Sequence, residues 1–160
     1  MNQDINYEDI VAARGRSRVL CIDYGDKRIG LALSDINWVI SSPYSVVESR
    51  TGFQKIKSIV DENNVSVILI GLPITLGGEE GGRQLEKVKK FAAKCQNELC
   101  SVVMWDERLS TSAMLHVCKE IGMSNNKRKQ NIDMLSASFI LDGWLQYINN
   151  TFPKCTDARL

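Results

Sequence analysis

The stretch "VLCIDYGDKRIGLAL", residues 19–33, decides the fold of this chain. It opens with apolar residues, turns at Gly25-Asp26-Lys27 and returns through a second apolar run. The pattern predicts two strands, Arg18 to Tyr24 and Arg28 to Ser34, joined as a hairpin. The first strand carries Asp23 at its end. A buried carboxylate costs free energy unless it has a partner, so this aspartate needs an explanation.

Beyond the hairpin, the chain alternates between strand and helix patterns. A third strand is predicted over residues 38–47, where Pro43 indicates an edge or an interruption. Helices are predicted over 51–63 and 85–99, and short strands over 65–70 and 101–105. One more helix begins at Ser110 or Thr111, and the last runs from Ile132 to about Ile148. This order predicts an α/β fold with a mixed sheet and helices on its faces.

Length and composition indicate one globular domain. The 160 residues divide into a polar leader (1–17), a single domain (18–150) and a tail (151–160). The net charge of +1 gives little long-range attraction for nucleic acid, so any anionic partner depends on local clusters. The five cysteines have no metal or redox spacing, and no apolar run is long enough for a signal peptide or a membrane span. We therefore expect a cytoplasmic protein with no membrane partner.

Acidic residues stand where a ligand would bind to such a sheet. Asp23 ends the first strand, and Asp106 and Glu107 follow the last strand. Ligands collect at the carboxyl ends of the strands, and central strands are often adjacent, so these groups are expected to meet. Simpler structural roles are open for some of the acids. Asp106 and Glu107 could pair with Arg108 at the surface. Asp133, in the first turn of the last predicted helix, could stabilise that helix through its dipole.

The last helix is expected to bring Asp133 to the same place. Its small residues Ser136 and Ala137 would let the helix lie close to the sheet. Asp133 falls at the margin of the predicted apolar arc, which consists of Ile132, Leu135, Ser136, Phe139, Ile140, Gly143, Trp144 and Tyr147. Carboxylates gathered in this way repel one another, and Mg²⁺ or Mn²⁺ would remove the conflict. Two such ions can clamp a phosphodiester for hydrolysis.

Several residues could bind phosphate beside these acids. Gly25 would let backbone N–H groups approach an anion, and Lys27 and Arg28 add charge, although the glycines at 25 and 30 could simply serve a tight turn. A basic loop with Lys127 and Lys129 precedes Asp133 and could hold nucleic-acid phosphates, or be a solvated charge run. Trp105 and Tyr24 could stack on bases, but core packing is the better interpretation for both.

Four motifs resemble the YqgF/RuvX family in order and spacing. They are "IDYGDKRIGLALSD" (22–35), "ILIGLPITLGGEEG" (68–81), "WDERLSTSAM" (105–114) and "NIDMLSASFILDGWL" (131–145). The resemblance spans roughly residues 18 to 148. It implies a ribonuclease H-like fold, with a mixed five-stranded sheet and helices on both faces. It also implies a nuclease, described as acting on precursor 16S ribosomal RNA or as a Holliday-junction resolvase related to RuvC.

The resemblance places the metal ligands on Asp23, on Asp106 or Glu107, and on Asp133. Our assignment gives metal to Asp23, Glu107 and Asp133, with Asp106 helping in catalysis. Arg108 matches the third residue of the "DER" motif and would steady the acids or contact phosphate. Two departures stand out: Ser136 replaces a usual alanine, and the glutamate that RuvC-type enzymes carry on the strand ending at Gly71 is absent. The "DER" motif would replace that glutamate.

Three classes of function follow. The first is a Mg²⁺- or Mn²⁺-dependent endonuclease that processes the 5′ end of precursor 16S rRNA on a ribosomal particle, with cleavage of branched DNA as the close alternative. The second is an ATP-binding module, which shares the Asp23-Tyr24-Gly25 pattern but needs two domains. The third is a catalytically silent nucleic-acid-binding protein. A resolvase should be a symmetric homodimer, whereas a trimming nuclease can be a monomer.

Overall fold

The computed structural model describes residues 5–72, 79–106 and 125–154 of the chain. Its elements follow the order α1 (Tyr7–Val11), β1 (Arg18–Tyr24), β2 (Arg28–Ser34), β3 (Ser41–Glu48), α2 (Gly52–Glu62), β4 (Val65–Leu72), α3 (Glu79–Glu98), β5 (Ser101–Asp106) and α5 (Asn125–Thr151). The predicted hairpin is confirmed with the expected bounds. The helix predicted from Ser110 or Thr111 lies outside the described residues.

The five strands form one mixed sheet in the order β3-β2-β1-β4-β5. β1 pairs antiparallel with β2 and parallel with β4, and β4 pairs parallel with β5. β3 is an edge strand, as Pro43 predicted, and this proline sits at a shift in register opposite Ala32. The expected meeting of Asp23 with Asp106 and Glu107 rested on adjacent central strands, but β4 lies between β1 and β5.

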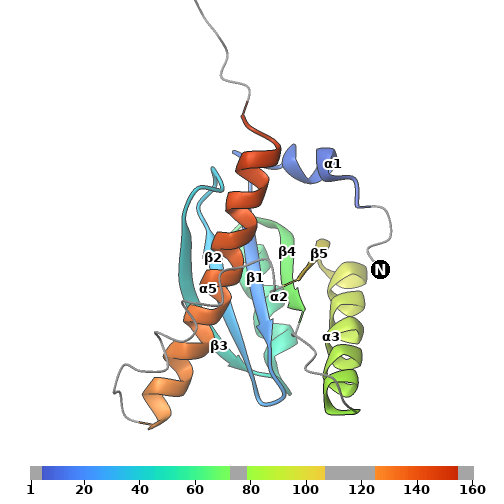
Figure 1. Ribbon diagram of the computed structural model, residues 1–160, viewed down its shortest axis with the longest axis vertical. Coiled ribbons are helices and arrows are strands. Elements are labelled where there is room, and N and C mark those ends of the chain that lie inside the picture. The colour runs from blue at the N-terminus through green and yellow to red at the C-terminus, as the bar shows by residue number, and fades with distance from the viewer. Residues whose placement is uncertain (1–4, 73–78, 107–124, 155–160) are drawn as a thin grey trace, which may run out of the picture.

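Helices cover both faces of the sheet (Figure 1). α5 crosses one face over β1, β2 and β3, while α2 and α3 pack on the other. The strands alternate accordingly: Val19 and Cys21 of β1 face α5, whereas Leu20 and Ile22 face the opposite core. The prediction of an α/β sheet with helices on both faces is confirmed.

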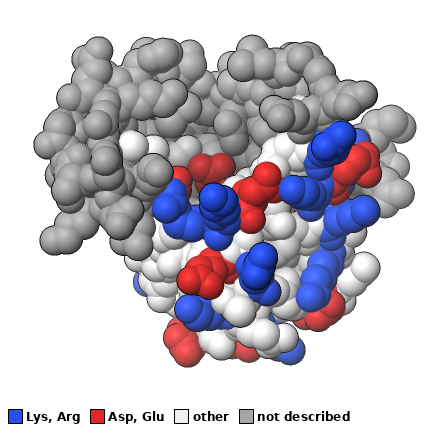
Figure 2. Space-filling view, turned by 90° about the horizontal axis from the view of Figure 1, so that it is seen from below, with Lys and Arg blue, Asp and Glu red and all other residues white. Residues whose placement is uncertain are grey.

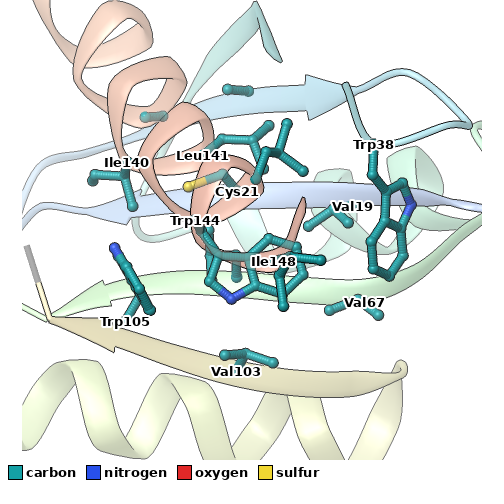
Figure 3. Close-up of a cluster of buried hydrophobic side chains, with 14 of the residues drawn as sticks. Val19, Cys21, Trp38, Val67, Val103, Trp105, Ile140, Leu141, Trp144 and Ile148 are labelled. Atoms are coloured by element: carbon teal, nitrogen blue, oxygen red, sulfur yellow. The ribbon is translucent and has the colours of Figure 1, made fainter. Parts of the chain in front are cut away.

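The core beneath α5 is rich in tryptophan (Figure 3). Trp38 and Trp144 are fully buried, with ring centroids 5.6 Å apart. The predicted third strand began at Trp38, which is wrong: β3 begins at Ser41, because Trp38 turns inward at φ 59° and its indole donates to the Ser17 carbonyl at 2.8 Å. A non-glycine residue at this positive φ lies outside the β region, so the strand cannot run through Trp38.

Helix α5 begins seven residues earlier than predicted, at Asn125 instead of Ile132. Lysine, arginine and glutamine are good helix formers, so the basic stretch extends the helix and is no loop. Asp133 consequently stands in the third turn of α5, where a helix-dipole role no longer applies. The predicted apolar arc is also out of phase: the buried residues are Ala137, Ser138, Ile140, Leu141, Trp144, Leu145 and Ile148. Asp133 lies one turn before Ala137, in line with this buried face.

The N-terminal segment packs against the end of α5. Tyr7 stacks on Phe152, with ring centroids 6.0 Å apart. Arg14 donates to Asn149 Oδ1 at 2.9 Å and to the Phe152 carbonyl at 2.8 Å. Ile10 is buried in the tryptophan-rich core. The division into leader, domain and tail stays a prediction. In the described part of the chain, no helix has the length and apolar character needed to cross a bilayer.

Candidate active site

The candidate site lies on the α5 face, at the carboxyl end of β1. Asp23 follows Cys21 on this face by strand alternation, and its cross-strand partner on β2 is Gly30. Hydrophobic residues of both cores surround β1, so Asp23 stands at the edge of a buried strand as the sequence predicted. The packing of α5 on Gly30 sets the geometry around Asp23.

Gly30 lets α5 lie directly on the sheet. A Cβ added at this position would stand 2.1 Å from the Asp133 carbonyl oxygen and 2.6 Å from its carbonyl carbon. No side chain fits in that space, so glycine is required for the close approach of the helix. Because Gly30 pairs with Asp23, the contact brings Asp133 over the end of β1. The structure therefore brings Asp23 and Asp133 together.

The environment of Asp23 raises the pKa of its carboxyl group. Burial is the largest cause, a hydrogen bond with Ser136 opposes it, and the charge of Asp133 raises the pKa further. A carboxylate that is desolvated and faces a second carboxylate is destabilised in its charged form. Ser136, predicted only as a small residue, therefore also partners Asp23.

Arg28 pairs with the second carboxylate. Its Nε donates to Asp133 Oδ2 at 2.8 Å, and both side chains are about one-third exposed, at 36% and 28%. Sequence reasoning assigned Arg28 to phosphate, and the phosphate role stays a prediction. The pairing itself was missed, because the two residues are 105 positions apart and no local pattern relates them.

The remaining acids are placed differently. Asp106 ends β5, two strands from β1 and thus on the order of 10 Å away in the sheet. Trp105 packs into the core on the α5 side, so strand alternation directs Asp106 to the opposite face. Its catalytic role stays a prediction. Glu107 and Arg108 lie outside the described residues, and within those residues no three acidic, histidine or cysteine side chains form a group able to hold a metal ion.

The hairpin turn gives Gly25 a steric reason. The Gly25 N–H donates to the Arg28 carbonyl at 3.0 Å, and a Cβ at this glycine would stand 2.5 Å from that same oxygen. Ser49, the residue after β3, closes the turn, since its Oγ donates to the Gly25 carbonyl at 2.6 Å. Lys27 is exposed at the tip. The tight-turn reading accounts for Gly25 without an anion, and phosphate binding by Gly25 and Lys27 stays a prediction.

Two contacts from α3 to this hairpin were not predicted. Gln84 Nε2 donates to the Tyr24 carbonyl at 3.1 Å, and Lys87 Nζ lies 2.6 Å from Asp26 Oδ1. They tie the first turns of α3 to the strand that carries Asp23. Tyr24 and Trp105 are packing residues as expected. The ring centroids of Tyr24 and Phe91 are 4.8 Å apart, and those of Trp105 and Tyr147 are 5.2 Å apart. The backbone at Lys127 and Lys129 belongs to the first two turns of α5.

Relatives with this sequence pattern are known. A protein of Maridesulfovibrio salexigens is 39% identical over 132 residues, which are 80% of this chain and 97% of the relative. A protein of Paramagnetospirillum magneticum is 36% identical over 143 residues, 86% of this chain and 91% of the relative. Both bear the name "Putative pre-16S rRNA nuclease".

A solved structure with the same arrangement of strands and helices identifies the fold. RuvC of T. thermophilus, solved in complex with a Holliday junction substrate, superimposes with a TM-score of 0.53 over 82% of this chain and 96% of its own, at 9% identity. The fold of the chain is therefore ribonuclease H-like. The family model described as "RuvX: Holliday junction resolvase" matches residues 17–147. These matches show that the chain belongs to the RuvX family.

Proposed function

We propose that this chain is a divalent-metal-dependent endonuclease that processes the 5′ end of precursor 16S rRNA. One observation carries the proposal: Asp23, desolvated at the end of a central strand, faces Asp133 across the contact with Gly30. Folding places two carboxylates together without a cation among the described residues to neutralise Asp23 directly. Such arrangements are concentrated at functional sites.

The chemistry of the pair fits a hard divalent cation. Carboxylate oxygens are the ligands that Mg²⁺ and Mn²⁺ prefer, and a cation would relieve the repulsion between Asp23 and Asp133. We assign these two residues to the metal, with Glu107 as the further ligand. A bound ion would supply Lewis acidity and lower the pKa of water, and both effects promote hydrolysis of a phosphodiester.

The surrounding residues orient the two carboxylates. Ser136, on the same helix as Asp133, hydrogen-bonds Asp23. Arg28 holds Oδ2 of Asp133, which fixes the orientation of that side chain. A charged, bonded guanidinium at this place limits the repulsion in the absence of metal. Lys27, Lys127, Lys129 and Arg108 would bind substrate phosphates around the site.

The names of the relatives favour RNA, whereas the description of the family model favours branched DNA. We therefore keep cleavage of Holliday junctions as the second candidate. A resolvase should be a symmetric dimer with two such sites. The described cysteines Cys95 and Cys100 form no disulfide, which supports a reducing compartment such as the cytoplasm.

The decisive experiment incubates precursor 16S rRNA and a four-way DNA junction, in parallel, with the protein and Mn²⁺. We expect RNA cleavage by the wild type and a loss of at least about 100-fold in Asp23→Asn and Asp133→Asn, since removing a catalytic group costs roughly this much or more. Asp142→Asn is the matched control, because Asp142 lies on α5 and contacts Gln146 at 2.9 Å. This variant should cleave normally.

The other outcomes separate the candidates. Cleavage of the junction alone, by a protein that is dimeric in light scattering, would assign it to DNA. RNA binding with no cleavage in Mn²⁺ or Mg²⁺ would leave a silent binding protein. Titration of Mn²⁺ followed by electron paramagnetic resonance tests the ligands without relying on activity: Asp23→Asn and Asp133→Asn should each weaken binding, while Asp142→Asn should not.

A further inference from the structure

We propose that one face of α3 is a second nucleic-acid contact, which binds the phosphate backbone of the strand held at Asp23. This inference rests on the proposed function. The surface is the α3 stripe, defined as Arg83, Lys87 and Lys90. With Gly82 and Glu86 these residues line an open groove. Counted with Glu86 and with Asp26, which pairs with Lys87, the three basic side chains leave a net charge of +1, a sign that suits a polyanion.

The stripe follows from helical spacing. Arg83, Lys87 and Lys90 are four and three positions apart, so they share one side of α3. Their Cα atoms span about 10 Å along the helix axis. A row of cations on one side of a helix can follow the charged backbone of one nucleic-acid strand. Lys94 continues the line, and its Nζ lies 3.9 Å from the centroid of the Phe53 ring.

The stripe reaches the hairpin that carries Asp23, although α3 packs on the face of the sheet opposite α5. Gln84, next to Arg83, donates to the carbonyl of Tyr24, and Tyr24 directly follows Asp23. Lys87 reaches Asp26 at the hairpin tip. Seen from this end of the molecule, Lys and Arg side chains gather on the described surface with Asp and Glu among them (Figure 2). A strand leaving Asp23 over the hairpin would meet the α3 stripe next.

The chain contains a matched pair of residues for the test. Lys89 and Lys90 are neighbours on the same helix, both exposed and of equal charge. Lys90 lines the groove, whereas Lys89 lies roughly 100° around the helix from it. Lys90→Gln and Lys89→Gln remove the same charge from the same element. Neither residue belongs to the proposed metal site, and thermal unfolding should be equal for the two variants.

The experiment measures binding without cleavage. A labelled stem-loop RNA carrying a precursor 16S rRNA leader sequence is titrated with protein in EDTA, by fluorescence anisotropy, at increasing KCl. We expect Lys90→Gln to weaken binding and to reduce the slope of log Kd against log salt by about 0.7 to 1, the loss of one phosphate contact. A second stem-loop of unrelated sequence should show the same change, because phosphate contacts carry no sequence information. Lys89→Gln should match the wild type.

The outcomes distinguish this inference from the proposed function. If the wild type binds and cleaves the RNA but Lys90→Gln keeps the slope of Lys89→Gln, the α3 contact is wrong and the nuclease assignment stands. If Lys90→Gln loses its share of the slope but no variant cleaves, the contact stands and the nuclease assignment fails. If the wild type binds neither RNA nor a four-way junction, both are wrong.

Discussion

Two aspartates at opposite ends of the first hairpin have opposite environments. Asp35 follows β2, and its carboxylate accepts backbone N–H groups from Val39 at 2.6 Å, Ile40 at 2.8 Å and Asn37 at 3.0 Å. Burial alone would raise the pKa of Asp35, but these hydrogen bonds and that of its own N–H lower it overall. For Asp23, burial and Asp133 outweigh the single bond with Ser136, and the pKa is raised.

The contrast shows how to tell a structural carboxylate from a functional one. Asp35 is satisfied by the loop that it organises, so folding explains it completely. Asp23 is held where its charged form is disfavoured, and the hydrogen bond with Ser136 compensates only in part. A group maintained at such a cost is expected to gain its partner from outside the chain. Substitutions at or beside the two aspartates should change these environments in different ways.

The largest effect is expected from Gly30→Ala. The new methyl group would overlap the backbone of Asp133, so α5 must move away from β2 and the two carboxylates must separate. Overpacking of this kind costs about 3 kcal/mol in the free energy of unfolding, measured by urea denaturation. Gly82→Ala is the control, because nothing lies within 4 Å of the added Cβ. It should stabilise the protein by about 0.5 to 1 kcal/mol, since alanine is the better helix former. Equal stability of the two variants would refute the proposed contact.

A smaller loss is expected from Asp35→Ala, which removes the acceptor for the loop. Because Asp35 accepts three backbone hydrogen bonds as a charged group, the variant should lose about 1 to 2 kcal/mol in its free energy of unfolding at neutral pH. Because the folded pKa is below the ordinary value near 3.9, this stabilisation is present at higher pH and lost as pH falls through the lowered pKa. Unfolding curves of variant and wild type should therefore converge in strong acid. Asp61→Ala, at an exposed position of α2, should change stability by less than about 0.5 kcal/mol.

The smallest effect has the opposite sign. Asp23→Asn should stabilise the metal-free protein at neutral pH, measured as a small rise in Tm. The folded pKa is raised, so the cost of ionising Asp23 appears as pH rises above the ordinary carboxyl pKa and is complete above the folded one. The gain should thus vanish below about pH 4. A destabilised variant at pH 7 in EDTA would show that Asp23 is satisfied like Asp35.

Much of the fold was predictable from local patterns. Strands β1, β2, β4 and β5 and helices α2 and α3 lie within a few residues of their predicted bounds, except that α3 starts six residues early. Alternation and helical spacing are read within a short window, and the hairpin turn is set by Gly25. The start of α5 was misplaced because its basic residues were read as a loop signal, although their helix propensity is high.

By itself, the sequence determined an α/β sheet with an acidic residue at the end of its first strand, because periodicity and turn chemistry act between near neighbours. The tertiary structure alone decided which groups meet that residue. Gly30 admits the helix, Arg28 holds Asp133, and β4 separates β1 from β5. These contacts join residues far apart in the chain, and they depend on how closely the helix and the sheet pack. Neither the composition nor the spacing of residues predicts how closely α5 packs on the sheet.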